Sequence, residues 1–275
     1  MTDRYAVIGN PIAHSKSPLI HRMFAQQTGQ DIEYEAVPAP LDGFAATIER
    51  LRKEGYKGCN ITVPFKLEAW KLSGEHTSRA IDAEAANTLT FKDTGIFIDN
   101  TDGAGLVQDI ERNLGVRLEG KRILLIGAGG AAYGVLHPLL EASRTSLVIY
   151  NRTLEKATSL KKTVEQHANF RHFSVKAIAF GELGKEQFDA VINATSAGLT
   201  DSEIPLPETI FAPGALAYDM MYGRETPFMK FAREHGAAVV SDGLGMLVEQ
   251  AAEAFYIWRG VRPATAPVIA ALRNR

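Results

Sequence analysis

Residues 121–134 read KRILLIGAGGAAYG and carry the clearest structural signal in this chain of 275 residues. An apolar run at 123–126 enters a glycine turn at 127–130, and a helical pattern then continues to Leu140. A second apolar run follows at 146–150, which is the spacing of a βαβ unit. Glycines in such a turn bring backbone N–H groups close to a pyrophosphate at the amino end of a helix. The stretch therefore predicts a dinucleotide site.

The end of the second apolar run indicates which dinucleotide. An NAD site usually carries Asp or Glu about 20 residues beyond the glycines, but residues 142–154 hold no acid. The guanidinium of Arg152 suits a 2′-phosphate and can stack on adenine, while Asn151 and Thr153 offer neutral hydrogen bonds. Lys156 follows one turn later. These residues favour NADP over NAD; the alternative is an exposed loop in which Thr153 caps the next helix.

Composition and charge exclude several classes of protein. The net charge of −2 gives no basic surface for nucleic acid. Cys59 is the only cysteine, so an intramolecular disulfide and a cysteine-built metal site are excluded. The seven histidines form no HxH or HxxxH pair, and we expect no metal. Neither a membrane span nor a signal peptide is evident, so we expect a cytoplasmic enzyme without a membrane partner.

The second half of the chain continues the alternation of strands and helices. Apolar runs at 175–179, 190–193, 215–219 and 237–241 alternate with helical patterns at 154–168 and 227–235. This order predicts a doubly wound parallel sheet with helices on both faces. The small polar segment 193–198 ends one strand and reads either as a wall of the cofactor site or as a plain tight turn.

The first hundred residues predict a separate α/β unit. Strands are expected at 5–8, 34–37 and 58–63, helices at 18–27, 44–53 and 65–72, and a hairpin at 87–91 and 96–99. A helix at 103–114, closed by Gly115, leads into the glycine-turn domain. The last helix, 244–258, is apolar on most faces, and we expect it to be buried against the first domain.

Polar residues gather where the strands of this unit end. Ser15 and Ser17 offer two hydroxyls that suit a carboxylate or a diol, or else Ser17 only caps a helix that begins with Pro18. Lys66 lies in the first turn of a helix, where a positive charge is electrostatically disfavoured. Asp102 reads as a helix cap, but together with Lys66 it could polarise a hydroxyl or carbonyl and handle its proton.

Eight strings stand out along the chain: VIGNPIAHSKSP, NITVPFK, NTDG, GAGGAA, NRT, NATSAG, DMMY and SDGLGMLVEQA. Strings of this kind occur in the same order in shikimate dehydrogenases. The chain resembles that family from Tyr5 to about Pro263. The resemblance implies reversible, NADPH-dependent reduction of 3-dehydroshikimate to shikimate in chorismate and aromatic amino-acid biosynthesis. It also implies two α/β domains with a cleft between them: a substrate domain formed by 1–101 plus 242–275, and a Rossmann-like NADP-binding domain at 102–241.

The resemblance assigns roles to residues of this chain. The family's catalytic pair falls on Lys66 and Asp102. Its substrate contacts fall on Ser15, Ser17, Thr62, Asn87 and Gln250, with Tyr222 close by. Its cofactor contacts fall on Gly127, Ala128, Gly129, Gly130, Ala131, Asn151, Arg152 and Thr153, then on Met220 and Gly243.

The chain departs from the family pattern at one position, and its sequence is compatible with several alternatives. Tyr133 stands where the family often has a basic residue, which affects a secondary contact rather than the site. A related enzyme that also takes quinate or NAD is one alternative, and a non-catalytic NADP-binding sensor is another, although the retained Lys66 and Asp102 argue against the sensor. Methylene-tetrahydrofolate dehydrogenases share the two-domain plan, but the SKS and NTDG strings do not suit them. The sequence leaves open a monomer or a homodimer.

Overall fold

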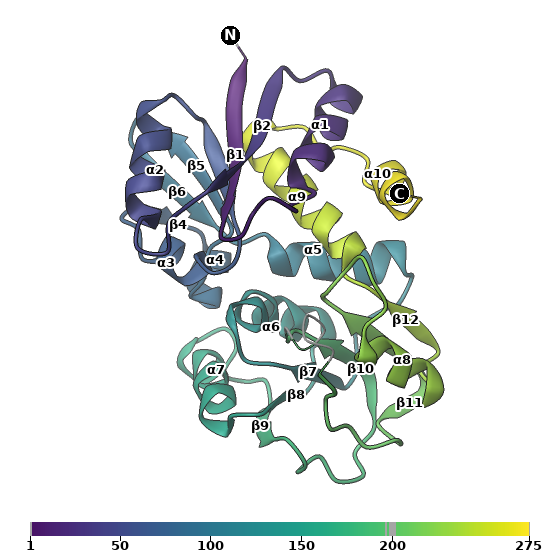
Figure 1. Ribbon diagram of the computed structural model, residues 1–275. Helices are drawn as coiled ribbons and strands as arrows, with labels where there is room; N and C mark the ends of the chain where they lie inside the picture. Colours follow the sequence, from purple (N-terminus) through teal and green to yellow (C-terminus); the bar gives the residue numbers. More distant parts are fainter. Residues whose placement is uncertain (1, 196, 198–201, 275) are drawn as a thin grey trace. The chain divides into compact units, whose positions relative to one another are not determined.

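The computed structural model of the protein describes residues 2–195, 197 and 202–274 (Figure 1). These residues divide into two compact units. One runs to Gly105 and resumes at Leu247, and the other is Leu106–Met246. The two boundaries fall within helices α5 (Asp102–Gln108) and α9 (Leu244–Arg259), whereas the sequence placed them at 101/102 and 241/242.

The first unit is built on a mixed six-stranded sheet with the order β2-β1-β3-β5-β6-β4. Its strands are β1 (Asp3–Gly9), β2 (Ile32–Pro38), β3 (Gly58–Ile61), β4 (Glu75–His76), β5 (Thr88–Lys92) and β6 (Gly95–Asp99). The first three strands are mutually parallel, while β5 and β6 form the predicted antiparallel hairpin.

Helices cover both faces of this sheet. Successive side chains of a strand point to opposite faces, so the sheet packs against helices on both sides. Ala6 and Ile8 of β1 pack with α2 (Phe44–Lys53), α3 (Lys66–Trp70) and α4 (Ser78–Ala83). Tyr5 of the same strand stacks instead on Trp258 of α9. Helix α1 (Ser17–Thr28) lies on the α9 side, and α10 (Ala266–Arg273) follows α9 (Figure 1).

The second unit is a six-stranded sheet whose paired strands are all parallel, with the order β12-β11-β10-β7-β8-β9. Its strands are β7 (Ile123–Ile126), β8 (Leu147–Asn151), β9 (Val175–Ala179), β10 (Phe188–Asn193), β11 (Phe211–Asp219) and β12 (Val239–Ser241). Its α-helices are α6 (Gly130–Ser143), α7 (Leu154–Gln166) and α8 (Pro227–Glu234). This strand order, with its reversal between β7 and β10, is that of a dinucleotide-binding sheet.

The core of this sheet follows the alternation of β7. Ile123 and Leu125 belong to one buried cluster, whereas Leu124 and Ile126 belong to the cluster on the opposite face. The run ILLI is therefore fully apolar because both faces of the strand are covered. The doubly wound α/β sheet predicted from the sequence is confirmed. No helix among the described residues has the length and apolar character needed to cross a bilayer.

The structure corrects several predicted elements. The helix predicted at 103–114 changes to a π-helix at Asp109–Asn113, and β3 ends at Ile61 rather than at residue 63. The sequence did not predict β4, α4 or α10. Strand β4 has two residues and α4 has six, which is too short for an apolar period to develop.

Candidate active site

Lys66 and Asp102 come together in the first unit, as their chemistry suggested. Lys66 is the first residue of α3, and its Nζ lies 2.6 Å from Oδ2 of Asp102. The two side chains are largely buried, with 18% and 7% of their surfaces exposed. A charged pair held this close and away from water can bind a polar substrate oxygen and exchange a proton with it.

Asp102 does not act as the helix cap that its position suggested. It is the first residue of α5, and its backbone N–H donates to Oδ1 of Asn100 at 3.0 Å. The Asp102 carboxylate accepts instead from Lys66 and from Nδ2 of Asn87, the latter at 2.8 Å. Both carboxylate oxygens are thus held by side chains from other elements.

Asn87 joins this pair to the last long helix. Its Nδ2 lies 3.3 Å from Oε1 of Gln250 and 3.0 Å from Oγ1 of Thr101. Its Oδ1 accepts from the Thr101 backbone N–H at 2.8 Å. Asn87, Thr101, Asp102 and Gln250 are all buried, and the predicted residues Lys66, Asp102, Asn87 and Gln250 form one connected cluster.

Sequence reasoning missed three residues that support this cluster. Thr101 lies inside the NTDG string, so that motif was a usable signal for it. Asn60, inside NITVPFK, donates to the Asn87 carbonyl at 3.2 Å, and Tyr34 donates to Asn60 Oδ1 at 2.8 Å. Nothing in the sequence marked Tyr34, because it lies on a strand far from either motif.

Ser15 and Ser17 lie at the start of α1. The helix begins at Ser17, and Lys16 occupies the cap position without a side-chain bond. The alternative that Ser17 only caps the helix is therefore wrong. Ser15 Oγ accepts from the Ser17 backbone N–H at 3.3 Å. Thr62 follows β3, and no hydrogen bond among the described residues joins it or either serine to the Lys66–Asp102 pair.

The glycine turn lies between β7 and α6, as predicted. Gly127 has φ 109°, and a Cβ there would lie 3.1 Å from the Ala194 carbonyl carbon, so a side chain would be strained and crowded. A Cβ on Gly129 or Gly130 would meet no atom within 4 Å. The amino end of the 14-residue helix α6 is thus open to a ligand, which fits a pyrophosphate.

The residues predicted to bind the adenosine end lie at the end of β8. Asn151 Nδ2 donates to the Thr153 carbonyl at 2.8 Å, which fixes the turn. Arg152 and Lys156 are exposed, and no carboxylate of the described residues pairs with Arg152. Thr153 occupies the cap position of α7, but its side chain makes no cap bond. Arg152 therefore remains available to an anion.

Met220 and Gly243 meet beyond the ends of β11 and β12. A Cβ on Gly243 would lie 2.3 Å from the Met220 carbonyl oxygen, so the approach requires glycine. Tyr222 belongs to the second unit, whereas the Lys66 cluster belongs to the first, and burial raises the pKa of Tyr222. In the segment 193–198, Thr195 donates to Asn193 Oδ1 at 2.7 Å, whereas Ser196 and Gly198 lie outside the described residues.

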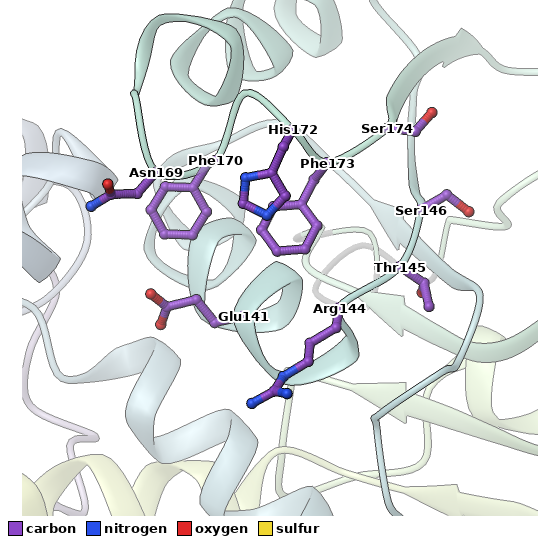
Figure 2. A pocket seen from close by; sticks show the side chains of 9 residues that line it. All are labelled: Glu141, Arg144, Thr145, Ser146, Asn169, Phe170, His172, Phe173 and Ser174. Carbon is purple, nitrogen blue, oxygen red and sulfur yellow. The ribbon is translucent and has the colours of Figure 1, made fainter.

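A cavity of about 650 Å³ in the second unit is a separate feature (Figure 2). It is lined by Glu141, Arg144, Thr145, Ser146, Asn169, Phe170, His172, Phe173 and Ser174. Ser146 and Ser174 directly precede β8 and β9, so this cavity lies at the amino ends of the strands. Dinucleotides bind at the carboxyl ends, and no predicted site residue lines the cavity. It is not the candidate active site.

The strand order of the second unit and its open glycine turn define a dinucleotide-binding α/β protein. The first unit adds a buried cluster suited to polar, proton-exchanging chemistry.

Comparison with known proteins narrows this class. Residues 7–89 match the substrate-binding domain of shikimate dehydrogenase, residues 108–200 match shikimate/quinate 5-dehydrogenase, and residues 243–273 match the shikimate 5′-dehydrogenase C-terminal domain. A protein of Methylobacillus flagellatus named shikimate dehydrogenase (NADP(+)) is 63% identical over 271 residues, 98% of this chain and 99% of the relative. The chain belongs to the shikimate dehydrogenase family, which confirms the resemblance found in the sequence strings.

Solved structures agree with this assignment. The Ael1 enzyme from Pseudomonas putida has a TM-score of 0.90 and 49% identity, with 98% of both chains covered. Shikimate 5-dehydrogenase from Thermus thermophilus, solved in complex with NADP(H) and shikimate, has a TM-score of 0.87 and 30% identity, with 99% of both chains covered.

Proposed function

We propose that the protein catalyses the reversible, NADPH-dependent reduction of 3-dehydroshikimate to shikimate, a step of chorismate and aromatic amino-acid biosynthesis. The observation that carries this proposal is the connected cluster of Lys66, Asp102, Asn87 and Gln250 in a chain of this family. The 63% identical relative bears the name of that activity and of NADP.

The cluster suits the reduction of a ketone that carries neighbouring hydroxyls. NADPH, when bound, supplies the hydride. The ketone oxygen gains negative charge during reduction, and the Lys66 ammonium can stabilise it and supply its proton. In the reverse direction, neutral Lys66 accepts the hydroxyl proton. Asp102 and Asn87 add fixed acceptor and donor atoms that can orient the substrate hydroxyls.

The remaining predicted residues divide between substrate and cofactor. Ser15 and Ser17 bind the substrate carboxylate, and Thr62, Gln250 and Tyr222 complete the substrate contacts. The cofactor is held by the glycine turn (Gly127, Ala128, Gly129, Gly130 and Ala131), by Asn151, Arg152, Thr153 and Lys156, and by Met220 and Gly243. Two observations support this division. The amino end of α6 is open, and the Arg152 guanidinium pairs with no carboxylate of the described residues.

Initial rates with shikimate and quinate, each with NADP and with NAD, test the proposal. We expect shikimate with NADP to give the highest kcat/KM. Comparable rates with quinate would favour the shikimate/quinate alternative, which the family description of residues 108–200 also names. NADP binding without turnover of either substrate would favour the sensor alternative and contradict the proposal.

The proposal includes a cytoplasmic location, in keeping with the single, buried cysteine. It also includes a monomeric or homodimeric state. Light scattering of the purified protein distinguishes these two states, and a larger assembly would contradict both.

A further inference from the structure

Arg79 holds two carboxylates from different parts of the first unit. It lies on α4, an element that the sequence did not predict. Its Nη2 and Nε lie 2.7 and 3.1 Å from the two oxygens of Asp99, and its Nη1 lies 2.9 Å from Oε1 of Glu253. The Asp99 and Glu253 side chains are only 3% and 17% exposed, whereas the Arg79 side chain is 33% exposed, so the two carboxylates are sheltered and the guanidinium is partly open to water.

One of these carboxylates leads directly to Asp102. Asp99 ends β6, and its Oδ1 also accepts from the Asn100 backbone N–H at 2.7 Å. Asn100 Oδ1 in turn accepts from the Asp102 backbone N–H at 3.0 Å. The Arg79 guanidinium therefore holds segment 99–102, which places the Asp102 carboxylate beside Lys66.

The other carboxylate leads to Gln250. Glu253 follows Gln250 by three residues on α9, so the two side chains lie on the same face of that helix. Gln250 and Asp102 both contact Asn87 Nδ2, at 3.3 and 2.8 Å. Their separation must stay within narrow limits for one amide group to contact both.

We propose that Arg79 is a positioning residue for the substrate site: its guanidinium fixes the separation between Asp102 and Gln250. This inference rests on the proposed function. The planar fork of arginine suits the task because it donates to two carboxylates in set directions, which the single ammonium of a lysine cannot do. Arg79 touches neither Asp102 nor Gln250 and acts through Asp99 and Glu253.

The first test compares Arg79→Gln and Arg79→Lys in steady-state oxidation of shikimate with NADP. We expect KM for shikimate to rise and kcat/KM for shikimate to fall about ten- to a hundredfold in Arg79→Gln, because a small misplacement of binding groups is costly. Arg79→Lys should fall between that variant and the unmutated protein. KM for NADP should stay within about twofold, since the predicted cofactor residues belong to the other unit.

A matched control separates positioning from a general loosening of α9. Arg259, on the same helix, pairs with Asp3 of β1 and also donates to Gln30, but none of these partners belongs to the Asn87 cluster. Arg259→Gln should therefore lower the melting temperature without changing KM for shikimate. An equal rise of this KM in both variants would overturn the proposal.

A double-mutant cycle of Arg79 and Gln250 measures an energetic coupling that a purely structural role of Arg79 would not produce. If Arg79 acts partly through Gln250, the effect of Arg79→Gln on kcat/KM must shrink in a Gln250→Ala background. Equal effects in the two backgrounds, within about twofold, would overturn the proposal.

Two outcomes remain distinct. An unmutated protein that does not oxidise shikimate contradicts the proposed function. An active protein with unchanged kinetics in folded Arg79→Gln contradicts only the role of Arg79. Should Arg79→Gln fail to fold by circular dichroism, Arg79→Lys decides alone, and unchanged KM for shikimate in that variant overturns the proposal.

Discussion

Lys66 Nζ lies 2.6 Å from Asp102 Oδ2, and Asn87 holds the other oxygen of the same carboxylate at 2.8 Å. Asp102 is therefore fixed from two sides before any substrate binds. The Lys66 ammonium begins a helix, where positive charge is disfavoured, and the carboxylate offsets that cost. Both partners are thus set in place for chemistry on a polar oxygen.

We expect Lys66→Ala to lower kcat by at least about a hundredfold while KM for shikimate changes little. Positioned proton transfer is typically worth about 10² to 10⁴ in rate, and it acts in the transition state rather than in binding. Steady-state kinetics on the purified variant, with its fold confirmed by circular dichroism, check this expectation. A folded variant with near-normal kcat would remove Lys66 from the mechanism.

Asp102→Ala should damage both kcat and KM. The carboxylate orients Lys66, and in the proposed function it also binds a substrate hydroxyl. Removing it leaves the Lys66 ammonium and the Asn87 amide without an acceptor that both now use. Asp102→Asn is the matched variant, since it keeps the shape but not the charge. An unchanged KM in both variants would exclude a binding role for this residue.

Replacing Ser15 and Ser17 together by Ala should raise KM for shikimate more than it lowers kcat. Contacts to a carboxylate far from the reacting oxygen exist in the ground state and the transition state alike. Ser15 Oγ accepts from the Ser17 backbone N–H at 3.3 Å, so the melting temperature should also fall somewhat, and circular dichroism checks that the double variant is folded. Unchanged KM in the double variant would show that the serines do not bind the carboxylate.

Arg152→Ala should remove most of the preference for NADP and leave the use of NAD nearly unchanged. We expect the unmutated protein to prefer NADP by at least about tenfold in kcat/KM, since a charge-assisted hydrogen bond contributes roughly 1.5–3 kcal/mol. Arg171→Ala changes an exposed arginine outside the predicted site and serves as the control. Equal use of both cofactors by the unmutated protein would contradict the prediction.

The local pattern of apolar residues and glycines was sufficient to predict the sheet of the second unit. The run ILLI at β7, the glycine turn and the next strand each carry their signal within a few residues, and the resulting sheet is the expected one. Lys66 and Asp102 were also visible, because polar residues at strand ends gather at one edge of a sheet.

Long-range contacts account for what the sequence did not predict. Asn87 and Gln250 are 163 residues apart, and their contact needed the family resemblance rather than any local period. Arg79 meets Glu253 across 174 residues from a six-residue helix, where no periodicity marks its partner. The Ser-Pro pair correctly predicted that a helix starts near residue 17. It placed Ser17 at the cap position, whereas Ser17 is already the first residue of the helix.

The last prediction concerns His21 of α1, whose neighbour Tyr34 donates a hydrogen bond to Asn60. Its ring is fully buried and stacks on Tyr34, with centroids 4.0 Å apart. Burial lowers the pKa of His21 to about 3, against an ordinary value of 6.5. Between these two values the unfolded chain binds a proton that the folded chain does not, so stability falls as the pH drops below 6.5.

His21→Phe should remove this contribution while keeping an aromatic ring in the stack. Below about pH 6.5 the unmutated protein loses stability progressively through His21, by about 2 kcal/mol at pH 5 relative to pH 8. Urea unfolding at pH 5 and pH 8 measures the difference for both proteins. His172→Gln, which replaces an exposed histidine, should keep the full difference. If His21→Phe also loses the same stability between pH 8 and pH 5, the buried His21 is not the group that titrates.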